Sequence, residues 1–277
     1  MKLFVTGGTG FIGSHFVQQA LAAGHEVRAL RRLGSSPRIP LAVEPEWLEV
    51  SFDRLEPQHF AGIEAVVHLA AHSANVPYDS LENCLHWNVT VPLRMADRAW
   101  GGGVRRFVVA GSCFEYGRSG ERYERIPPDA PLEPTLSYPI SKAAASMAWQ
   151  GFARERNAAV SIARIFQVYG DGEPAGRLWP ALRAAALTGA DYPMTAGEQI
   201  RDFVEVGAVA KQLLWQTENG QAAAGVPRVL HIGTGHPKTV RDFAEYWWNY
   251  WGAKGSLKIG VVPYRAGEMM RYVPRVK

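Results

Sequence analysis

Three polar side chains are spaced so that they can move a proton together: Ser112, Tyr138 and Lys142. Ser112 follows an apolar segment typical of a strand, and ligands of open α/β sheets bind at the carboxyl ends of strands. Tyr138 and Lys142 are four residues apart, which places them on one face of a helix. A nearby ammonium lowers the pKa of a tyrosine from its usual value of about 10. The pattern predicts that Tyr138 transfers a proton while Ser112 hydrogen-bonds the substrate oxygen.

A glycine-rich turn supplies a second constellation. Gly7, Gly10 and Gly13 lie between an apolar segment at 2–6 and a helical pattern at 11–23. One glycine makes the tight turn, one lets the backbone approach phosphates, and one lets the helix pack closely on the strand. Free N–H groups at the start of the helix then meet an anion. A glycine triplet alone also fits an ordinary turn, but the strand and helix around it favour a dinucleotide pyrophosphate site.

Apolar strands alternate with amphipathic helices along the first part of the chain, which predicts an α/β fold with a doubly wound parallel sheet. The expected strands cover 2–6, 26–31, 47–50, 65–70, 106–111 and 160–165, and two long helices cover 80–100 and 137–156. Beyond Ile165, prolines and glycine-bearing loops separate shorter helices. We expect a cofactor domain at 1–165 and a smaller substrate-binding portion at 166–277, with a late strand at about 229–232 returning to the sheet.

Composition excludes several other classes. With 47% hydrophobic and 20% charged residues among 277, the chain can bury a full core. The net charge of +4 fits anionic ligands, but the arginines are scattered, so no nucleic-acid partner is predicted. A first strand at residue 2 and the lack of a long apolar run predict a cytoplasmic protein with no membrane partner. Cys84 and Cys113 lack the spacing of metal ligands, so we expect no metal and no disulfide.

Seven segments occur in an order that resembles a known family. They are 6–13, 68–71, 88–90, 111–117, 138–142, 164–170 and 201–206. With them the chain resembles the extended short-chain dehydrogenase/reductase family, in its NAD(P)-dependent nucleotide-sugar epimerase/dehydratase/reductase branch, over nearly its whole length. The resemblance implies a Rossmann-like cofactor domain, a nucleoside-diphosphate sugar as substrate, and Ser112, Tyr138 and Lys142 as catalytic residues.

The resemblance also implies which residues bind the cofactor. They are Gly7, Thr9, Gly10, Phe11, Ile12, Gly13, Arg31, Arg32, Asp53, Leu69, Ala70, Ala71, Tyr138, Lys142 and Ile165. NAD-dependent relatives carry an acidic residue at the end of the second strand, whereas this chain has Arg31 and Arg32 there. Arginine matches a 2′-phosphate, so we predict NADP(H) over NAD(H). Alternatively, one arginine stacks on adenine or faces solvent. Asp53 resembles a residue that contacts the adenine amino group, or it is a simple loop aspartate.

Three further residues are implied to lie near the nucleotide diphosphate: Gln167, Arg201 and Arg265. Arginine suits this task through its planar fork of donors. A surface salt bridge is the alternative for each arginine. The resemblance also implies a homodimer built from the helices at 80–100 and 137–156. The apolar residues available for that seam, which equally fit plain core packing, are Leu85, Val89, Leu93 and Met147.

Departures from the family's patterns narrow the reaction. Cys113 and Phe114 stand where sugar-nucleotide 4,6-dehydratases carry Asp-Glu, which disfavours dehydration. Phe114 and Arg177 stand where fucose-synthase-like epimerase/reductases carry cysteine and histidine, which disfavours epimerisation by that pair. Glu115 is left as an unassigned acid–base candidate, or as a solvated loop residue.

Simple hydride chemistry then has two forms. In the first, NADPH reduces a 4-keto nucleoside-diphosphate sugar at C4 and Tyr138 donates the proton. In the second, a 4-epimerase with retained NAD(P) uses the same residues. Arg31 favours the reductase, because an NADP-type site suits net reduction by a dissociable cofactor. A non-catalytic NADP-sensing module is a third hypothesis; such proteins typically lose the tyrosine or the lysine, and this chain keeps both.

Overall fold

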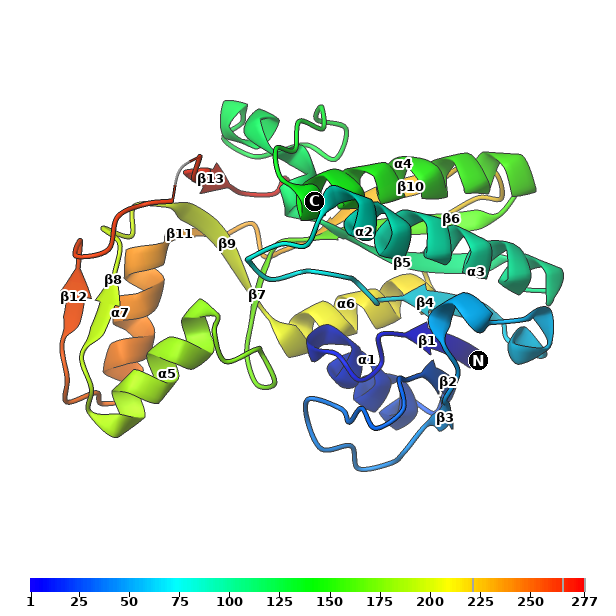
Figure 1. Cartoon of the computed structure of the whole chain (residues 1–277), viewed down its shortest axis with the longest axis horizontal. Helices are drawn as coiled ribbons and strands as arrows, with labels where there is room; N and C mark the ends of the chain where they lie inside the picture. The colour runs from blue at the N-terminus through cyan, green and yellow to red at the C-terminus, as the bar shows by residue number, and fades with distance from the viewer. Residues whose placement is uncertain (221, 266, 277) are drawn as a thin grey trace.

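The computed structural model describes residues 1–220, 222–265 and 267–276. Its larger lobe is built on a seven-stranded parallel sheet with the strand order β10-β6-β5-β4-β1-β2-β3 (Figure 1). The strands are β1 (Lys2–Thr6), β2 (Glu26–Leu30), β3 (Glu46–Leu48), β4 (Ala65–His68), β5 (Arg106–Ser112), β6 (Ala159–Ile165) and β10 (Arg228–Ile232). The expected doubly wound, Rossmann-like α/β fold is therefore confirmed.

Helices cover both faces of this sheet, which explains why its strands are continuous apolar runs. On one face lie α1 (Phe11–Ala22) and α6 (Val206–Glu218), packed on Leu3 and Val5 of β1. On the other face lie α3 (Val91–Gly101) and α4 (Ser137–Arg156). These two helices pack on Phe4, which lies between Leu3 and Val5 in β1. The alternation of side chains along β1 thus divides the core into two layers.

Two segments differ from the sequence-based expectation. The helix expected over 80–100 consists of α2 (Leu81–Leu85), a π-helical turn (His86–Thr90) and α3. Helix α6 comes from the second half of the chain yet packs against α1 on the large sheet. The sheet lobe therefore takes both α6 and β10 from beyond residue 165.

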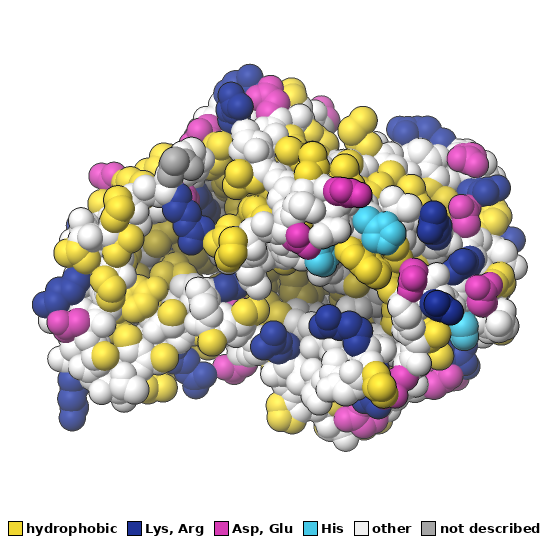
Figure 2. Space-filling model, in the orientation of Figure 1, with side chains coloured by type: hydrophobic (Ala, Val, Ile, Leu, Met, Phe, Trp, Pro, Cys, Tyr) yellow, Lys and Arg dark blue, Asp and Glu magenta, His cyan; other side chains and the backbone are white. Residues whose placement is uncertain are grey.

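The smaller lobe lies beside the carboxyl ends of the large sheet (Figure 1). Its elements are β7 (Gln167–Tyr169), α5 (Leu178–Thr188), β8 (Tyr192–Met194), β9 (Ile200–Glu205), β11 (Pro237–Thr239), α7 (Val240–Tyr250), β12 (Leu257–Ile259) and β13 (Arg271–Tyr272). Strand β9 is central here, because β7, β11 and β13 all pair with it. Figure 2 shows the surface hollowed between the two lobes. In the described residues, no helix is long and apolar enough to cross a bilayer.

Candidate functional site

The glycine turn lies directly against the end of β4. Gly7 has a φ of 73°, and a Cβ there would lie 2.6 Å from the backbone nitrogen of Ala70. The same nitrogen is 3.4 Å from the hydroxyl oxygen of Thr6, to which it donates. Only glycine combines this conformation with this close approach. The structure thus brings the turn at 7–13 against Leu69 and Ala70, and Ala71 follows them in the chain.

Helix α1 opens with an arrangement that suits an anion. Its N-cap is Gly10, which has no side chain to cap the helix, and half-buried Phe11 and Ile12 follow. The first N–H groups of a helix have no partner inside it and lie at the positive end of its dipole. Thr9 lies half-buried in the same turn. These features fit the pyrophosphate of a dinucleotide, with the Phe11, Ile12 and Gly13 amides as donors.

Arg31 lies at the end of β2 but already has a partner. Its Nε donates to a carboxylate oxygen of Glu49 at 2.7 Å, and its guanidinium carbon lies 5.1 Å from the centre of the Trp47 ring. The adjacent Arg32 is exposed. An arginine in a carboxylate pair offers a 2′-phosphate fewer free donors than the sequence alone suggested.

Asp53 lies exposed just beyond β3, in the 3₁₀ turn Phe52–Arg54. The Ser51 hydroxyl donates to its carboxylate and lowers the pKa of that group. Its backbone carbonyl accepts from Arg98 at 2.9 Å. The aspartate is thus held at the sheet edge as an accessible acceptor.

The three residues predicted to be catalytic converge at the carboxyl end of β5. Ser112 ends that strand in register with Ile165 of β6, and both are buried. Lys142 on α4 donates from Nζ to the carbonyl oxygen of Ala110, two residues before Ser112, at 2.7 Å. Tyr138 lies one turn earlier on the same helix and is 7% exposed. The register of β5 and the packing of α4 therefore place all three at one edge of the sheet.

Burial shifts the pKa values of Tyr138 and Lys142. It raises the pKa of Tyr138, with smaller contributions from Tyr78 and Glu115 in the same direction. It also lowers the pKa of Lys142, while the Glu115 charge opposes that change. Desolvation dominates the pKa of Tyr138, and Lys142 is not among the main groups that shift it; the lysine amine instead donates to the Ala110 carbonyl. Tyr138 is thus a protonated phenol at neutral pH.

Tyr78 is a site residue that the sequence did not indicate. Its ring packs on Tyr138 with ring centres 5.4 Å apart. Its loop is fastened to the start of α4, since Ser137 Oγ donates to the carbonyl of Asp79 at 2.7 Å. Asn88 adds a second connection, accepting from the backbone of His72 and donating to Ser141 Oγ. No periodic pattern marks this loop, so only the fold brings Tyr78 to Tyr138.

The two residues after Ser112 are poorly suited to exchange protons. Cys113 is buried, and burial raises the pKa of its thiol to about 12. Phe114 packs edge-on against Tyr272, with ring centres 5.8 Å apart. Glu115 is not solvated: it is fully buried in an ion pair with Arg164, so its interpretation as a solvated loop residue was wrong.

The expected substrate residues come from the smaller lobe and its connection. Gln167 is half-buried on β7, Arg201 is buried on β9, and Arg265 is exposed. Arg201 donates to Glu268 at 2.9 Å and also to the carbonyl of Met269, so its salt bridge is a buried one. Burial raises the pKa of Tyr78, and the positive charge of Arg265 opposes this, as that of Arg177 does.

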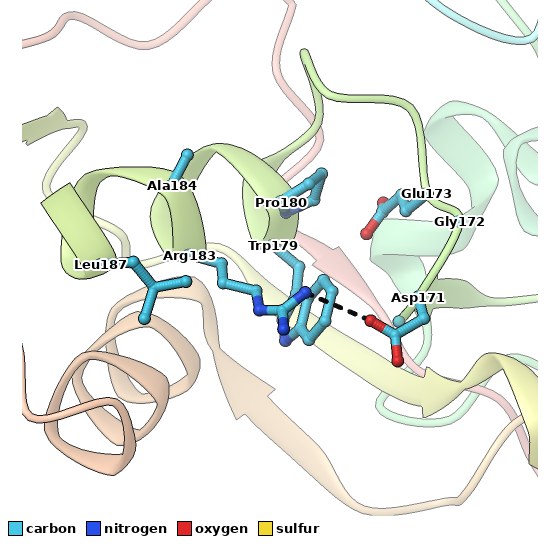
Figure 3. A pocket seen from close by; sticks show the side chains of 9 residues that line it. Asp171, Gly172, Glu173, Trp179, Pro180, Arg183, Ala184 and Leu187 are labelled. Atoms are coloured by element: carbon cyan, nitrogen blue, oxygen red, sulfur yellow. Dashed lines mark hydrogen bonds and ion pairs between the residues drawn. The ribbon is translucent and has the colours of Figure 1, made fainter. Parts of the chain in front are cut away.

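A pocket of about 290 Å³ lies between the 170–173 loop and α5 (Figure 3). Glu173 lines it and binds Arg177 Nε through Oε1 at 3.0 Å. Its Oε2 is buried and has no hydrogen-bond partner within the described part of the chain. Burial raises the pKa of this carboxyl to about 7, against the opposing charge of Arg177. The described residues contain no group of three or more His, Cys, Asp or Glu arranged to hold a metal ion.

The raised pKa of Glu173 predicts a pH-dependent stability. The folded chain binds this proton more tightly than the unfolded chain, whose glutamate titrates at about 4.3. The contribution is therefore present below about pH 4.3 and is lost as pH rises towards 7. Glu173→Gln should flatten the fall in unfolding free energy between pH 5 and pH 8, measured by urea denaturation. Asp171→Asn, which alters an exposed ion pair in the same pocket, should keep the wild-type slope; an equal slope in Glu173→Gln would contradict the assignment.

Comparison with known proteins agrees with this arrangement. The model of the NAD dependent epimerase/dehydratase family matches residues 3–233. A UDP-glucose 4-epimerase from Corynebacterium glutamicum is 26% identical, over 97% of this chain and 85% of its own length. The solved structure of TunA, described as a NAD dependent NDP-hexosamine 5,6-dehydratase, is 29% identical with a TM-score of 0.85, covering 99% of this chain and 88% of TunA. That of MoeE5 in complex with UDP-glucose and NAD is 27% identical with a TM-score of 0.84, covering 100% and 90%. The chain belongs to the NAD dependent epimerase/dehydratase family.

Proposed function

We propose that this protein is an NADP(H)-dependent reductase of a 4-keto nucleoside-diphosphate sugar. The observation that carries the proposal is the convergence of Ser112, Tyr138 and Lys142 at the end of β5, with a neutral thiol and a phenyl ring as their neighbours. These neighbours leave Tyr138 as the proton-exchanging group. Reduction also needs a proton donor at the outset, and burial keeps the Tyr138 phenol protonated.

Each residue then has a distinct task. When bound, NADPH supplies the hydride for C4. Tyr138 gives its phenolic proton to the oxygen that becomes the new hydroxyl, and Ser112 donates a hydrogen bond that orients this oxygen. Lys142 holds the nicotinamide ribose by its ammonium. Tyr78 covers the Tyr138 ring and limits the access of water to it.

The substrate class rests on the smaller lobe and on the relatives. Gln167, Arg201 and Arg265 are proposed to contact the nucleotide diphosphate, with Arg201 sharing its donors between a phosphate and Glu268. The similar MoeE5 structure holds UDP-glucose, which supports a nucleoside-diphosphate sugar as the ligand. A homodimer formed through α2–α3 and α4 is proposed as well; Met147 on α4 is 66% exposed and is available for such a seam.

The preference for NADP(H) gives a direct test at Arg31. Arg31→Asp is expected to weaken NADPH binding by about 10-fold or more, since hydrogen bonds to charged groups contribute about 1.5–3 kcal/mol. NADH binding should change much less. Both dissociation constants can be measured by quenching of tryptophan fluorescence. Glu49→Gln should release Arg31 and tighten NADPH binding.

The control for this test lies on the same strand. Arg28→Gln breaks a comparable pair with Glu46 and should leave the NADPH-to-NADH preference unchanged. Equal losses for both cofactors in Arg31→Asp would count against NADP(H). The similar MoeE5 structure favours NAD over NADP as the cofactor, because it was solved with NAD.

A 4-epimerase with retained NAD(P) is the second candidate. It is favoured by the similarity to the C. glutamicum UDP-glucose 4-epimerase and by the pairing of Arg31 with Glu49. The two functions are separated by the stoichiometry of cofactor use. A reductase consumes one NADPH per sugar converted, which is measured as a loss of nicotinamide absorbance. Sugar conversion without that loss would establish the epimerase. A chain that binds NADPH but converts no nucleotide sugar would instead be an NADP-sensing module.

A further inference from the structure

Glu115 lies in the 3₁₀ turn Cys113–Tyr116 and reaches back to the residue that ends β5. Its Oε1 accepts a hydrogen bond from the backbone nitrogen of Ser112 at 2.7 Å. The side chain is fully buried. Because the buried Glu115 carboxylate accepts from the Ser112 amide, it fixes the position of the Ser112 backbone.

The other carboxylate oxygen is held by two separate elements. Oε2 accepts from Ser146 Oγ on α4 at 2.7 Å and from Arg164 Nε on β6 at 2.7 Å. Arg164 is fixed in turn, since its Nη1 donates to the Tyr116 hydroxyl at 2.8 Å and to the Pro128 carbonyl at 2.7 Å. The carboxylate thus connects the end of β5 to the helix that carries Tyr138 and Lys142.

Gly111 makes this contact sterically possible. A Cβ at that position would lie 2.8 Å from Glu115 Oε1 and 3.1 Å from Cγ of Arg164. Any larger residue would push the carboxylate away from the Ser112 amide. The glycine before Ser112 is therefore explained by the carboxylate that it admits.

We infer that Glu115, paired with Arg164, is a positioning residue that fixes the Ser112 hydroxyl relative to Tyr138. This inference rests on the proposed function. It assigns Glu115 no contact with substrate and no proton transfer.

The test replaces the whole pair. Glu115→Met alone would leave the buried Arg164 charge without its carboxylate and destabilise the fold, whereas Glu115→Met/Arg164→Met removes both charges and keeps the volume filled. We expect kcat to fall about 10- to 100-fold, as for other small misplacements of reacting groups. The KM and the dissociation constant of NADPH should stay within about twofold, because both side chains of the pair are buried and the inference gives neither of them a contact with the sugar or the cofactor.

A double-mutant cycle with Ser112→Ala distinguishes a positioning effect on Ser112 from a general disturbance of the site. If Glu115 acts through the serine hydroxyl, the pair replacement should cause almost no further loss of kcat in the Ser112→Ala background. Gly111→Ala, which displaces the carboxylate and keeps both charges, should reproduce the loss if the double variant fails to fold. The matched charge control is Arg241→Gln/Glu245→Gln, an exposed pair on α7.

Unchanged kcat in the folded double variant, or losses that multiply in the Ser112→Ala background, would overturn the inference. Hydrogen exchange of the peptide 111–117 gives a readout that needs no substrate. The Ser112 amide should exchange slowly in the wild type and faster in the double variant. A wild-type chain that reduces no 4-keto nucleotide sugar refutes the proposed function, while unchanged exchange in the variant refutes the anchoring of Ser112.

Discussion

Replacing Tyr138 with phenylalanine is expected to lower kcat for a 4-keto nucleoside-diphosphate sugar by about 100- to 10,000-fold, the range of a lost general acid. The substitution removes one hydroxyl and keeps the ring that packs on Tyr78. NADPH binding should therefore persist, and the fold should be unaffected. Steady-state oxidation of NADPH, together with fluorescence titration of the cofactor, measures both quantities on the same sample.

A matched control for this variant is Tyr250→Phe, which removes a phenolic hydroxyl from the exposed face of α7. It should retain wild-type kcat. If Tyr138→Phe instead reduces every accepted sugar at the wild-type rate, Tyr138 is not the proton donor. Full binding of NADPH with no turnover in either the wild type or the variant would support the NADP-sensing hypothesis.

The large sheet could be predicted from sequence because its strands are buried on both faces. Runs such as Leu3–Val5 and Phe107–Val109 are apolar throughout, a pattern that loops do not show. The positions of Ser112 and the Tyr138 helix followed from the same logic, since the carboxyl ends of parallel strands lie at one edge of the sheet. Local pattern and global fold agree in this lobe.

Strand β9 contains buried charged residues that this reasoning does not predict. Arg201 and Asp202 are buried within it, which no hydrophobic pattern can indicate. Asp202 is satisfied by the Thr234 and Gly235 amides, more than 30 residues away, and Arg201 by Glu268. Their burial depends on partners that only the folded chain supplies.

Glu115 was misinterpreted for the same reason. Its partners Ser146 and Arg164 lie 31 and 49 residues further along the chain. A glutamate in a loop is usually solvated, and nothing local marks this one as an exception. Polar residues whose roles depend on distant partners are thus the part of the site that sequence reasoning misses.

Gly13→Ala is expected to weaken NADPH binding by about 10- to 100-fold, because each hydrogen bond lost between an α1 amide and the charged pyrophosphate costs about 1.5–3 kcal/mol. A Cβ on Gly13 would overlap the carbonyl oxygen of Gly7 and come within 2.7 Å of its carbon. The start of α1 must therefore move away from the turn, and its amides would no longer point at the pyrophosphate. The unfolding free energy should fall as well, since the same overlap is present without the cofactor.

The control for this variant is Gly151→Ala on α4, where a new Cβ would meet no atom within 4 Å. Both glycines are helical, so both variants gain the higher helix propensity of alanine, about 1 kcal/mol. Gly151→Ala should therefore be slightly more stable than the wild type and bind NADPH equally well. For Gly13→Ala, titration with NADPH measures the loss of binding and urea denaturation measures the loss of stability. A wild-type dissociation constant for NADPH would show that the turn tolerates a side chain. In that case the close contact of α1 with Gly7 would not be what holds the dinucleotide.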